Sequence, residues 1–388
     1  MPIYLDNAAT SFPKPEEVYR AVDRCLREQG AAFGRGTHSQ ADGVRNLVDD
    51  ARRAVARLID AYSHQHVVFT LNCTDSLNIA LQGLLRPGDR VITTTLEHNS
   101  VLRPLNHLAD QYDVDVTTIG FDPVSGIIDL EQFESELKNR PAKLAAFTHA
   151  SNVTGVVQPV KELTRLAHQY GALVLLDAAQ TTGHLPFSMS DLNVDLLAAA
   201  GHKGLLGPLG TGILALRPGL EQQISPFRFG GTGTNSESPK QPDAMPQRFE
   251  SGNLNVPGLA GLLAGVEWLE RQTIEQIARQ SEMLTEHLFE GLSQCDEVRF
   301  LSPESARPQA GIVSFVIDGM DSRDVGMILD QSFEIACRTG MHCAPLVHTA
   351  LNAESSGGSV RLSPGPFNTL EEVRSAIEAV STIAASGT

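Results

Sequence analysis

Apolar residues between positions 60 and 220 follow two alternating spacings. Short runs that are apolar throughout predict strands, and they fall at 66–70, 90–94, 114–119, 143–149, 171–180, 193–204 and 210–216. Apolar residues three or four positions apart predict helices between these runs, at 73–85, 100–112, 130–137 and 160–171. Strands that alternate with helices in this way indicate an α/β fold with a mostly parallel sheet flanked by helices. In such sheets, ligands bind at the carboxyl ends of the strands.

The N-terminal segment adds two further helices to this pattern. The first is predicted from Pro15, a favoured first helical position, with Val18, Val22 and Leu26 on one face. The second is amphipathic and spans 44–58.

The C-terminal third predicts a smaller α+β domain. We expect one long or broken helix followed by shorter elements, at 258–292, 311–317, 321–329 and 334–340. Thr369 with Glu372 three residues later forms a capping-box pattern at the start of a last helix. The chain is therefore expected to form a large domain over 15–255 and a small domain from 1–14 and 256–388.

Composition narrows the classes of function. The 388 residues are 41% apolar and 20% charged, which is ordinary for a globular protein, and the formal net charge of −16 argues against nucleic acid as a partner. No apolar stretch is as long as a membrane span, and the first residues lack the pattern of a signal peptide. Five scattered cysteines fit reduced thiols better than a disulfide framework. We expect a cytoplasmic protein.

Two charged residues follow predicted strands. Lys203 comes just after an apolar strand, and an amine in an apolar setting can have a lowered pKa and act as a nucleophile. Asp177 ends the run GALVLLD, where it could hold the ring nitrogen of a pyridinium cofactor in its protonated state. Taken singly, Lys203 is better explained as a surface lysine in a loop, whereas for Asp177 a turn-capping aspartate is an equally good interpretation.

Three other residues lie in similar positions. Thr74 follows a strand near the start of a helix, a place that suits phosphate as well as a simple helix cap. His98 follows the strand at 90–94 and could stack on a flat heterocycle. Cys343 lies in a Gly- and Pro-bounded loop near His342 and Arg338, whose positive charge could favour a thiolate; a buried, inert thiol is the alternative.

Taken together, the motifs resemble those of the class V, fold-type I pyridoxal-phosphate enzymes, and among them the Suf-type cysteine desulfurases and selenocysteine lyases. The resemblance covers nearly the whole chain. Its motifs are YLDNAAT, RGTHSQADGVRNLVDDAR, EHNSVLRP, SNVTGVVQPVKEL, DAAQTTGHLPFSM, GHKGLLGPLGTGIL, RFESGNLN, CRTGMHCAP and VRLSPGPFNTLEEV. The Asp-x-x-Gln strand end followed by Gly-His-Lys and RTGxHCA is the most specific part.

The resemblance implies a pyridoxal 5′-phosphate cofactor bound as a Schiff base to Lys203, with Asp177 as the partner of the ring nitrogen. The other residues that it implies around the cofactor are Gln180, His98 and Asn152 at the ring and Thr74, Cys73 and His202 at the phosphate. It implies that Lys203, Cys343 and His98 are catalytic. Arg361, assisted by Arg338 and near Asn152, would bind the substrate carboxylate.

The same resemblance implies the reaction. Cys343 would take sulfur from L-cysteine as a persulfide and leave L-alanine, and the sulfur would be delivered to an acceptor protein, for example in iron–sulfur cluster assembly. The resemblance also implies that the protein is a homodimer, in which Asn253 would reach the phosphate from the neighbouring subunit. No metal site is expected.

The chain departs from the family pattern at three places. Ala200 stands where the family often has serine, and Cys73 where it commonly has a second threonine. Gly252-Asn253-Leu254-Asn255 replaces Gly-Thr-x-Asn. Fewer phosphate contacts predict weaker cofactor binding or a divergent subfamily.

Other functions remain open from the sequence. A selenocysteine lyase, or a class V aminotransferase, epimerase or lyase on another amino acid, shares the fold, and Cys343 is the residue that separates a desulfurase from the latter group. A non-catalytic scaffold is less compatible with the presence of Lys203, Asp177 and Cys343 together. A nucleotide-dependent oxidoreductase is disfavoured because no complete glycine fingerprint follows a strand.

Overall fold

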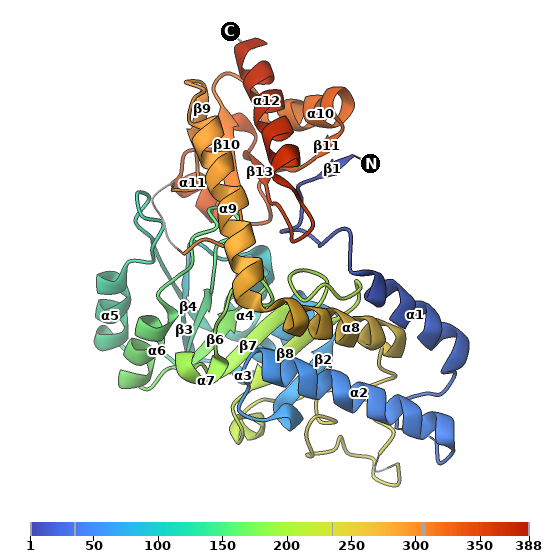
Figure 1. Ribbon diagram of the computed structural model, residues 1–388. Coiled ribbons are helices and arrows are strands. Elements are labelled where there is room, and N and C mark those ends of the chain that lie inside the picture. Colours follow the sequence, from blue (N-terminus) through green and yellow to red (C-terminus); the bar gives the residue numbers. More distant parts are fainter. Residues whose placement is uncertain (1, 35, 235, 304–307, 387–388) are drawn as a thin grey trace.

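A computed structural model describes residues 2–34, 36–234, 236–303 and 308–386, so Arg35 of the RGTHSQ motif lies outside the described residues. The described chain forms a seven-stranded sheet with the order β2-β8-β7-β6-β5-β3-β4 (Figure 1). The strands are β2 Val67–Thr70, β3 Arg90–Thr94, β4 Asp115–Ile119, β5 Leu144–Thr148, β6 Leu173–Asp177, β7 Leu196–Ala200 and β8 Gly212–Leu216. Only β8 runs against its neighbours, so the prediction of a mostly parallel sheet is confirmed.

Helices flank this sheet and connect its strands. They are α1 Glu16–Glu28, α2 Ser39–Leu58, α3 Cys73–Leu84, α4 Asn99–Tyr112, α5 Leu130–Asn139, α6 Val160–Gln169, α7 Met189–Leu192 and α8 Val256–Gln272. Because β2 and β8 are antiparallel, as are β8 and β7, strands β2 to β7 all point the same way. The segments that follow β2, β3, β5, β6 and β7 therefore meet at one edge of the sheet.

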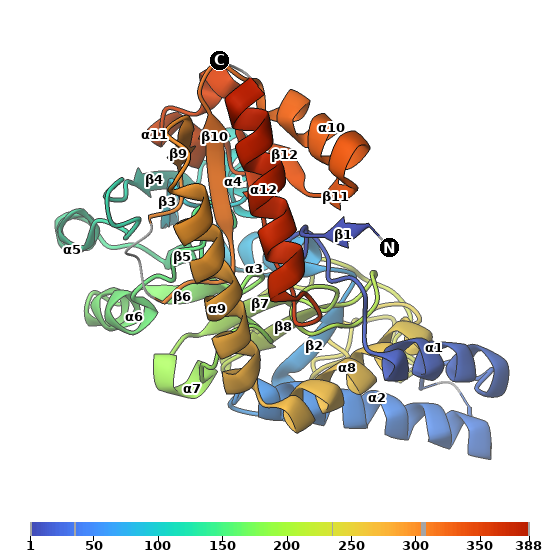
Figure 2. The ribbon, with the colours of Figure 1, turned by 45° about the horizontal axis from the view of Figure 1, so that its top comes forward.

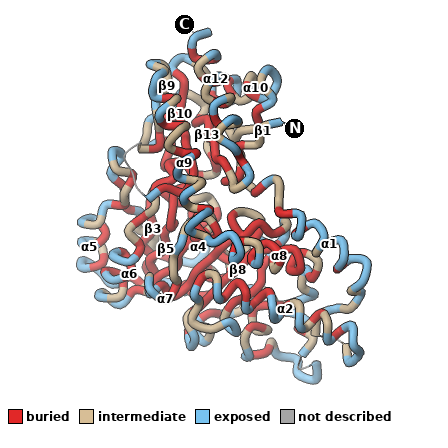
Figure 3. Tube along the Cα trace, viewed as in Figure 1, coloured by how far each residue is buried: buried red, intermediate tan, exposed pale blue. Residues whose placement is uncertain are grey.

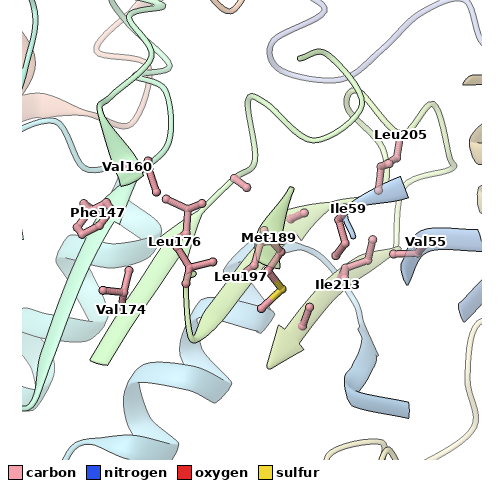
Figure 4. Packing of buried hydrophobic residues seen from close by; sticks show 14 of the residues in the cluster. Val55, Ile59, Phe147, Val160, Val174, Leu176, Met189, Leu197, Leu205 and Ile213 are labelled. Carbon is pink, nitrogen blue, oxygen red and sulfur yellow. The ribbon is translucent and has the colours of Figure 1, made fainter. Parts of the chain in front are cut away.

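Alternate residues of the central strands fill two cores. Phe147, Leu176, Leu197 and Ile213 pack on one face together with Ile59 and Met189 (Figure 4). Their sequence neighbours Ala146, Leu175, Ala198 and Leu214 pack on the other face. Figure 3 shows the resulting buried sheet inside a shell of half-buried and exposed helices. Strands buried on both faces are why the sequence shows continuous apolar runs.

The second part of the fold contains a four-stranded antiparallel sheet with the order β12-β13-β10-β9 (Figure 2). Its elements are α9 Ile274–Leu292, β9 Val298–Phe300, β10 Val313–Ile317, α10 Ser322–Phe333, β11 Ile335–Ala336, β12 Arg338–Gly340, α11 Pro345–Ala350, β13 Ser359–Leu362 and α12 Leu370–Ser386. The N-terminal strand β1 Ile3–Tyr4 pairs with β11, so the chain's beginning joins its C-terminal part.

The long helix expected at 258–292 is broken at Thr273, whose φ of 67° ends α8 and begins α9. Helix α8 packs on α1 and α2, whereas α9 packs on α12. The domain boundary at residue 255 stays a prediction, and these contacts lead us to propose that the chain passes between the two parts at Thr273.

Three features that the sequence predicts for the helices can be compared with the structure. The capping box is present: Glu372 N–H donates to Thr369 Oγ1 at 3.2 Å, and Thr369 N–H donates to Glu372 Oε2 at 2.8 Å. The predicted apolar face of α1 is wrong at Leu26, which is 67% exposed, whereas Cys25 is buried. Pro15 is the N-cap of α1 and not its first residue.

Among the described residues, no helix has the length and apolar character needed to span a membrane.

Candidate active site

A cavity of about 190 Å³ lies at the carboxyl edge of the large sheet. Its lining includes ten of the residues singled out in the sequence: Cys73, Thr74, His98, Asn152, Asp177, Gln180, His202, Lys203, Arg338 and Arg361. Cys343 lines an adjoining outer hollow that shares Thr74 and His98 with the cavity. A larger hollow of about 590 Å³ beside Gly34 holds none of these residues and is lined by residues of the segments 229–234 and 236–242.

Lys203 and Asp177 occupy the ends of neighbouring strands in this cavity. Withdrawal from water lowers the pKa of Lys203, an effect that the Asp177 carboxylate opposes. Asp177 Oδ1 accepts hydrogen bonds from Ala179 N–H at 2.9 Å and from the Cys73 thiol at 3.5 Å. Burial and the Asp177 charge raise the pKa of Cys73 well above its usual value, so Cys73 is a neutral thiol. The cavity therefore contains both an amine of lowered pKa and a carboxylate.

The loop that carries Lys203 packs closely against the turn after β6, and the contact leaves no room for a Cβ atom at two glycines. A Cβ at Gly183 would lie 2.3 Å from Gly204 O, and one at Gly204 would lie 2.4 Å from Thr182 O. Glycine at both positions therefore lets the GHKG segment approach the turn after β6.

His98 is the N-cap of α4, and its ring is fixed by two hydrogen bonds. Its Nδ1 accepts from Ser100 N–H at 3.0 Å and lies 2.8 Å from Ser100 Oγ, which is 2.7 Å from Thr74 Oγ1. Burial lowers the pKa of His98 to about 4, so the ring is neutral near pH 7. An acceptor role for Nδ1 places the proton of the neutral ring on Nε2.

The N-terminal segment supports the cavity from the other side, which the sequence did not indicate. The His202 carbonyl accepts from Ser11 N–H at 3.0 Å, Thr10 Oγ1 at 3.1 Å and Ser11 Oγ at 3.1 Å. Lys14 Nζ lies 3.5 Å from the same oxygen, and burial lowers the pKa of Lys14 to about 8. These contacts fix the peptide that precedes Lys203.

His202 and Gln180 line the remaining part of the cavity. His202 Nδ1 is buried and has no hydrogen-bond partner, and burial together with the Lys203 charge lowers the pKa of His202 to about 4. Gln180 Nε2 donates to the carbonyl of Ala8 at 3.2 Å. The unpartnered ring nitrogen can therefore bind a ligand atom.

Arg361 is buried and is the principal cation of the opposite wall. Its Nη2 donates to Asp6 Oδ1 at 2.9 Å, and its Nη1 donates to the Asn152 carbonyl at 2.9 Å. Its Nε is buried without a partner. Asp6 was missed in the sequence analysis, although it belongs to the YLDNAAT motif, because nothing in the sequence pairs it with Arg361.

The loop that carries Cys343 is held in an unusual backbone conformation. His342 and Cys343 have φ angles of 46° and 58°, consecutive left-handed values in residues other than glycine. Asn152 Nδ2 donates to the His342 carbonyl at 2.7 Å, and Asn99 N–H donates to the Cys343 carbonyl at 2.7 Å. Arg338 Nη2 lies 3.9 Å from Cys343 Sγ. The cysteine is thus a fixed, half-buried thiol beside a guanidinium.

His342 does not supply the positive charge that the sequence suggested, because burial lowers the pKa of His342 well below its usual value. Its Nε2 lies 2.9 Å from Ser359 Oγ, which is 3.0 Å from His348 Nε2. His348 Nδ1 lies 3.0 Å from the Ala344 carbonyl and must donate to it. With both rings neutral, His342 Nε2–H donates to Ser359 Oγ, and the Ser359 hydroxyl donates to His348 Nε2. The chain of hydrogen bonds ends at the carbonyl of Ala344, the residue after Cys343.

Glu97 links the end of β3 to the end of β5. It is fully buried, and its Oε1 accepts from Thr94 Oγ1 at 2.6 Å and from Thr148 N–H at 3.1 Å, whereas Oε2 has no partner. Burial raises the pKa of Glu97 to about 8. Nothing in the sequence singles out this residue, although it precedes His98.

Asn253 is the one predicted cofactor residue that lies apart. It lines a hollow of about 60 Å³ together with Leu71, Gly210 and Arg228, outside the cavity that contains Lys203. Among the described residues, no group of histidine, cysteine and carboxylate side chains is arranged to hold a metal ion.

Comparisons with known proteins give the class first. The model of the family "Aminotransferase class-V" matches residues 3–375, and the chain belongs to this family. Relatives that match over nearly their full length include proteins named as probable cysteine desulfurases. The chain is 36% identical to the probable cysteine desulfurase of Methanothermobacter thermautotrophicus, with 99% of this chain and 95% of the relative covered. It is 35% identical to that of Pyrococcus abyssi, over 96% and 91%. The structure is similar to the apo cysteine desulfurase of Thermococcus onnurineus NA1, with a TM-score of 0.92, 35% identity and coverage of 99% and 95%.

Proposed function

We propose that this protein is a pyridoxal-phosphate-dependent cysteine desulfurase, which converts L-cysteine to L-alanine and receives the sulfur on Cys343. One observation carries the proposal: a cavity containing an amine of lowered pKa and a carboxylate opens beside a fixed thiol next to Arg338. The names of two full-length relatives support it, since both are named as probable cysteine desulfurases.

The residues present suit pyridoxal phosphate. Asp177 offers a carboxylate at the carboxyl end of β6, and His202 offers a buried ring nitrogen that lacks a partner. The start of α3, where Cys73 and Thr74 lie, presents the positive end of a helix dipole to the same cavity. When bound, the cofactor would supply a ring that withdraws electrons from the substrate's α-carbon. Gln180 and His98 would contact its ring.

The lining residues have separate roles in the proposed reaction. Lys203 would bind the cofactor covalently and then move a proton at Nζ, for which a lowered pKa is suited. Arg361 would orient the substrate carboxylate, with Arg338 and Asn152 beside it. His98, neutral with its proton on Nε2, would stack and donate without adding charge.

Cys343 would carry out the sulfur transfer. Its thiolate would attack the sulfur of the substrate, so that a sulfur–sulfur bond forms while the carbon–sulfur bond breaks and leaves its electron pair on carbon. The departing carbon then takes a proton and becomes the methyl group of alanine. Arg338, 3.9 Å from Sγ, would stabilise the thiolate.

We further propose a homodimer. Leu71, Leu209 and Phe229 are 54%, 67% and 72% exposed, and Leu71 lines the hollow that contains Asn253. Leu71 precedes Asn72 and Cys73 of the cavity by one and two residues, so a partner covering these apolar side chains would lie beside the site. Asn253 of one chain would then be available to the phosphate of the other.

The five free cysteines support the predicted reduced, cytoplasmic setting.

The proposal is tested with Cys343→Ala, with Cys295→Ala as the matched control. Holoenzyme carrying Cys343→Ala should keep the visible spectrum of the bound cofactor but lose sulfide release and alanine formation from L-cysteine. Mass spectrometry of wild-type protein after cysteine, without reductant, should show one added sulfur on the peptide with Cys343. Wild-type rates in Cys343→Ala would refute the role of this thiol, and retained lyase or transaminase activity would favour another class V reaction.

A further inference from the structure

The outer hollow at Cys343 has not been given a function so far. Its volume is about 450 Å³, and it lies between α3 and α4, next to the cavity that contains Lys203. Its lining residues are Thr74, Asn78, Gln82, His98, Asn99, Ser100, Arg103, Pro104, His107 and Cys343. The hollow is the place where a group outside the inner cavity can reach the sulfur of Cys343.

The charges around this hollow oppose the charge of the whole chain. The formal net charge is −16, yet the lining contains Arg103 and His107 and no aspartate or glutamate among the described residues. Arg103 is exposed, and within the described chain its side chain forms no ion pair or hydrogen bond. Of the other thirteen exposed arginines in the described chain, seven pair with carboxylates, among them Arg57 and Arg165.

Two further features add positive potential at the same place. Helix α4 has 14 residues and begins at this hollow, and its first turn contains no acidic residue to neutralise the positive end of its dipole. Arg338 Nη2 lies 3.9 Å from Cys343 Sγ on the other side of the thiol. An anionic group in the hollow would therefore be attracted locally, although the protein as a whole repels it.

We propose that the outer hollow binds a sulfur acceptor, and that this acceptor is a small thiol carrying carboxylate groups, in place of the acceptor protein that the family resemblance implies. The volume falls within the range of roughly 300–1,000 Å³ that is common for small-molecule sites, and Arg103 is placed to pair with a carboxylate. The inference rests on the proposed function, in which Cys343 becomes a persulfide.

The transfer step is balanced without an added oxidant or reductant. The acceptor thiolate attacks the outer sulfur of the Cys343 persulfide, which forms a new sulfur–sulfur bond on the acceptor. The old sulfur–sulfur bond breaks, and its electron pair returns to Cys343 as a thiolate beside Arg338. The enzyme is then ready for another substrate.

The experiment compares acceptors that differ in charge. Wild-type holoenzyme is loaded with L-cysteine, freed of excess substrate, and mixed with mercaptosuccinate, 2-mercaptoethanol or cysteamine, and the loss of sulfur from Cys343 is followed by mass spectrometry. Rates are corrected for the thiolate fraction of each thiol. At low ionic strength mercaptosuccinate should react about tenfold faster than 2-mercaptoethanol, and cysteamine should be slowest. The advantage should shrink at about 0.5 M salt.

A matched pair of variants locates the effect. Arg103→Gln should remove most of the preference for mercaptosuccinate, whereas Arg279→Gln makes the same charge change on α9 and should retain it. Transfer is measured from protein that is already loaded, so failure to load at all would count against the proposed function and not against the acceptor site. Equal rates for the three thiols, or a preference that survives Arg103→Gln, would overturn the inference. Rapid transfer only to a cysteine in an acidic peptide would overturn it as well.

Discussion

Asp6 and Arg361 are 355 residues apart in sequence, yet Asp6 Oδ1 accepts a hydrogen bond from Arg361 Nη2 at 2.9 Å. The pair joins the N-terminal segment to β13 in the wall of the candidate active site. Part of the guanidinium that would bind the substrate carboxylate is therefore already engaged by a carboxylate of the protein. Asp6 is thus expected to set both the orientation and the charge balance of Arg361.

Asp6→Asn should destabilise the holoenzyme because Arg361 is left as an uncompensated buried charge. Breaking a fully buried pair costs roughly 3–5 kcal/mol, and a smaller loss of about 2 kcal/mol is expected because Asp6 retains 20% exposure. Added L-alanine, whose carboxylate can pair with Arg361, should raise the melting temperature more in the variant than in the wild type. Asp23→Asn, in the exposed pair with Arg27, is the control and should have little effect. Unchanged stability in Asp6→Asn would contradict the assigned pairing.

Lys203 should be the lysine that carries the cofactor. Reduction of the holoenzyme with borohydride should fix pyridoxal phosphate on the peptide that contains Lys203, and Lys203→Arg should lower activity on the order of 10³-fold or more. Lys14 is the internal control, because its pKa is also lowered by burial, to about 8. An adduct on Lys14 would show that a lowered pKa alone selects the lysine and would refute the role of Lys203.

Glu97 should make folding stability fall as the pH rises. Folded Glu97 holds its proton up to about pH 8, whereas the unfolded chain loses it near the ordinary value of 4.5. The folded state therefore binds more protons between pH 4.5 and 8, and stability from this group is present below 4.5 and lost toward 8, by up to about 1.4 kcal/mol per pH unit. Glu97→Gln removes this term.

Urea unfolding of Glu97→Gln and wild type at pH 6, 7 and 8 measures the effect. At each step to higher pH, the free energy of unfolding of the variant should rise relative to that of the wild type. The comparison cancels the opposite trend of the buried histidines: His98 and His149, with pKa values lowered to about 4, favour the folded state as the pH rises from 4 to 6.5. A difference that stays constant with pH would show that Glu97 ionises as it does in the unfolded chain.

Ser359 should position Cys343 through His342 and His348. Ser359→Ala removes the hydroxyl that links the two rings, and persulfide formation on Cys343 should slow about tenfold because a small displacement of a reacting group is costly. The spectral response of the cofactor to L-alanine, which needs no thiol, should be unchanged. Ser359→Thr keeps the hydroxyl and should recover most of the rate. Equal slowing in both variants would indicate a packing defect instead.

The proposed dimer predicts a change in mass on substitution of exposed apolar residues. Light scattering of the wild type should give twice the chain mass of 41.8 kDa, and Leu209→Glu combined with Phe229→Glu should shift it toward the monomer. Val124→Glu is the control, because Val124 is 80% exposed in a different part of the chain. A wild type that is monomeric and fully active would refute the dimer and the phosphate role of Asn253.

The sequence alone determined the large sheet and most of the cavity. Runs such as 196–200 are buried on both faces and therefore read as strands, and parallel strands bring their carboxyl ends together, which assembles Asp177, His98 and Lys203. The spacing of apolar residues was a weaker guide to which of two neighbouring positions on a helix is buried. Leu26 was assigned to the buried face of α1, but Cys25 is the residue that is buried.

Tertiary structure decided the contacts between distant segments. Nothing local relates Asp6 to Arg361, or Ser359 to His342 and His348. These pairings depend on how β1 pairs with β11 and how β12 pairs with β13. Burial likewise sets which groups are charged: it keeps His342 neutral, raises the pKa of Glu97 and lowers that of Lys203. A sequence specifies which chemical groups are present, but their ionisation depends on the water and charges that the folded chain leaves around them.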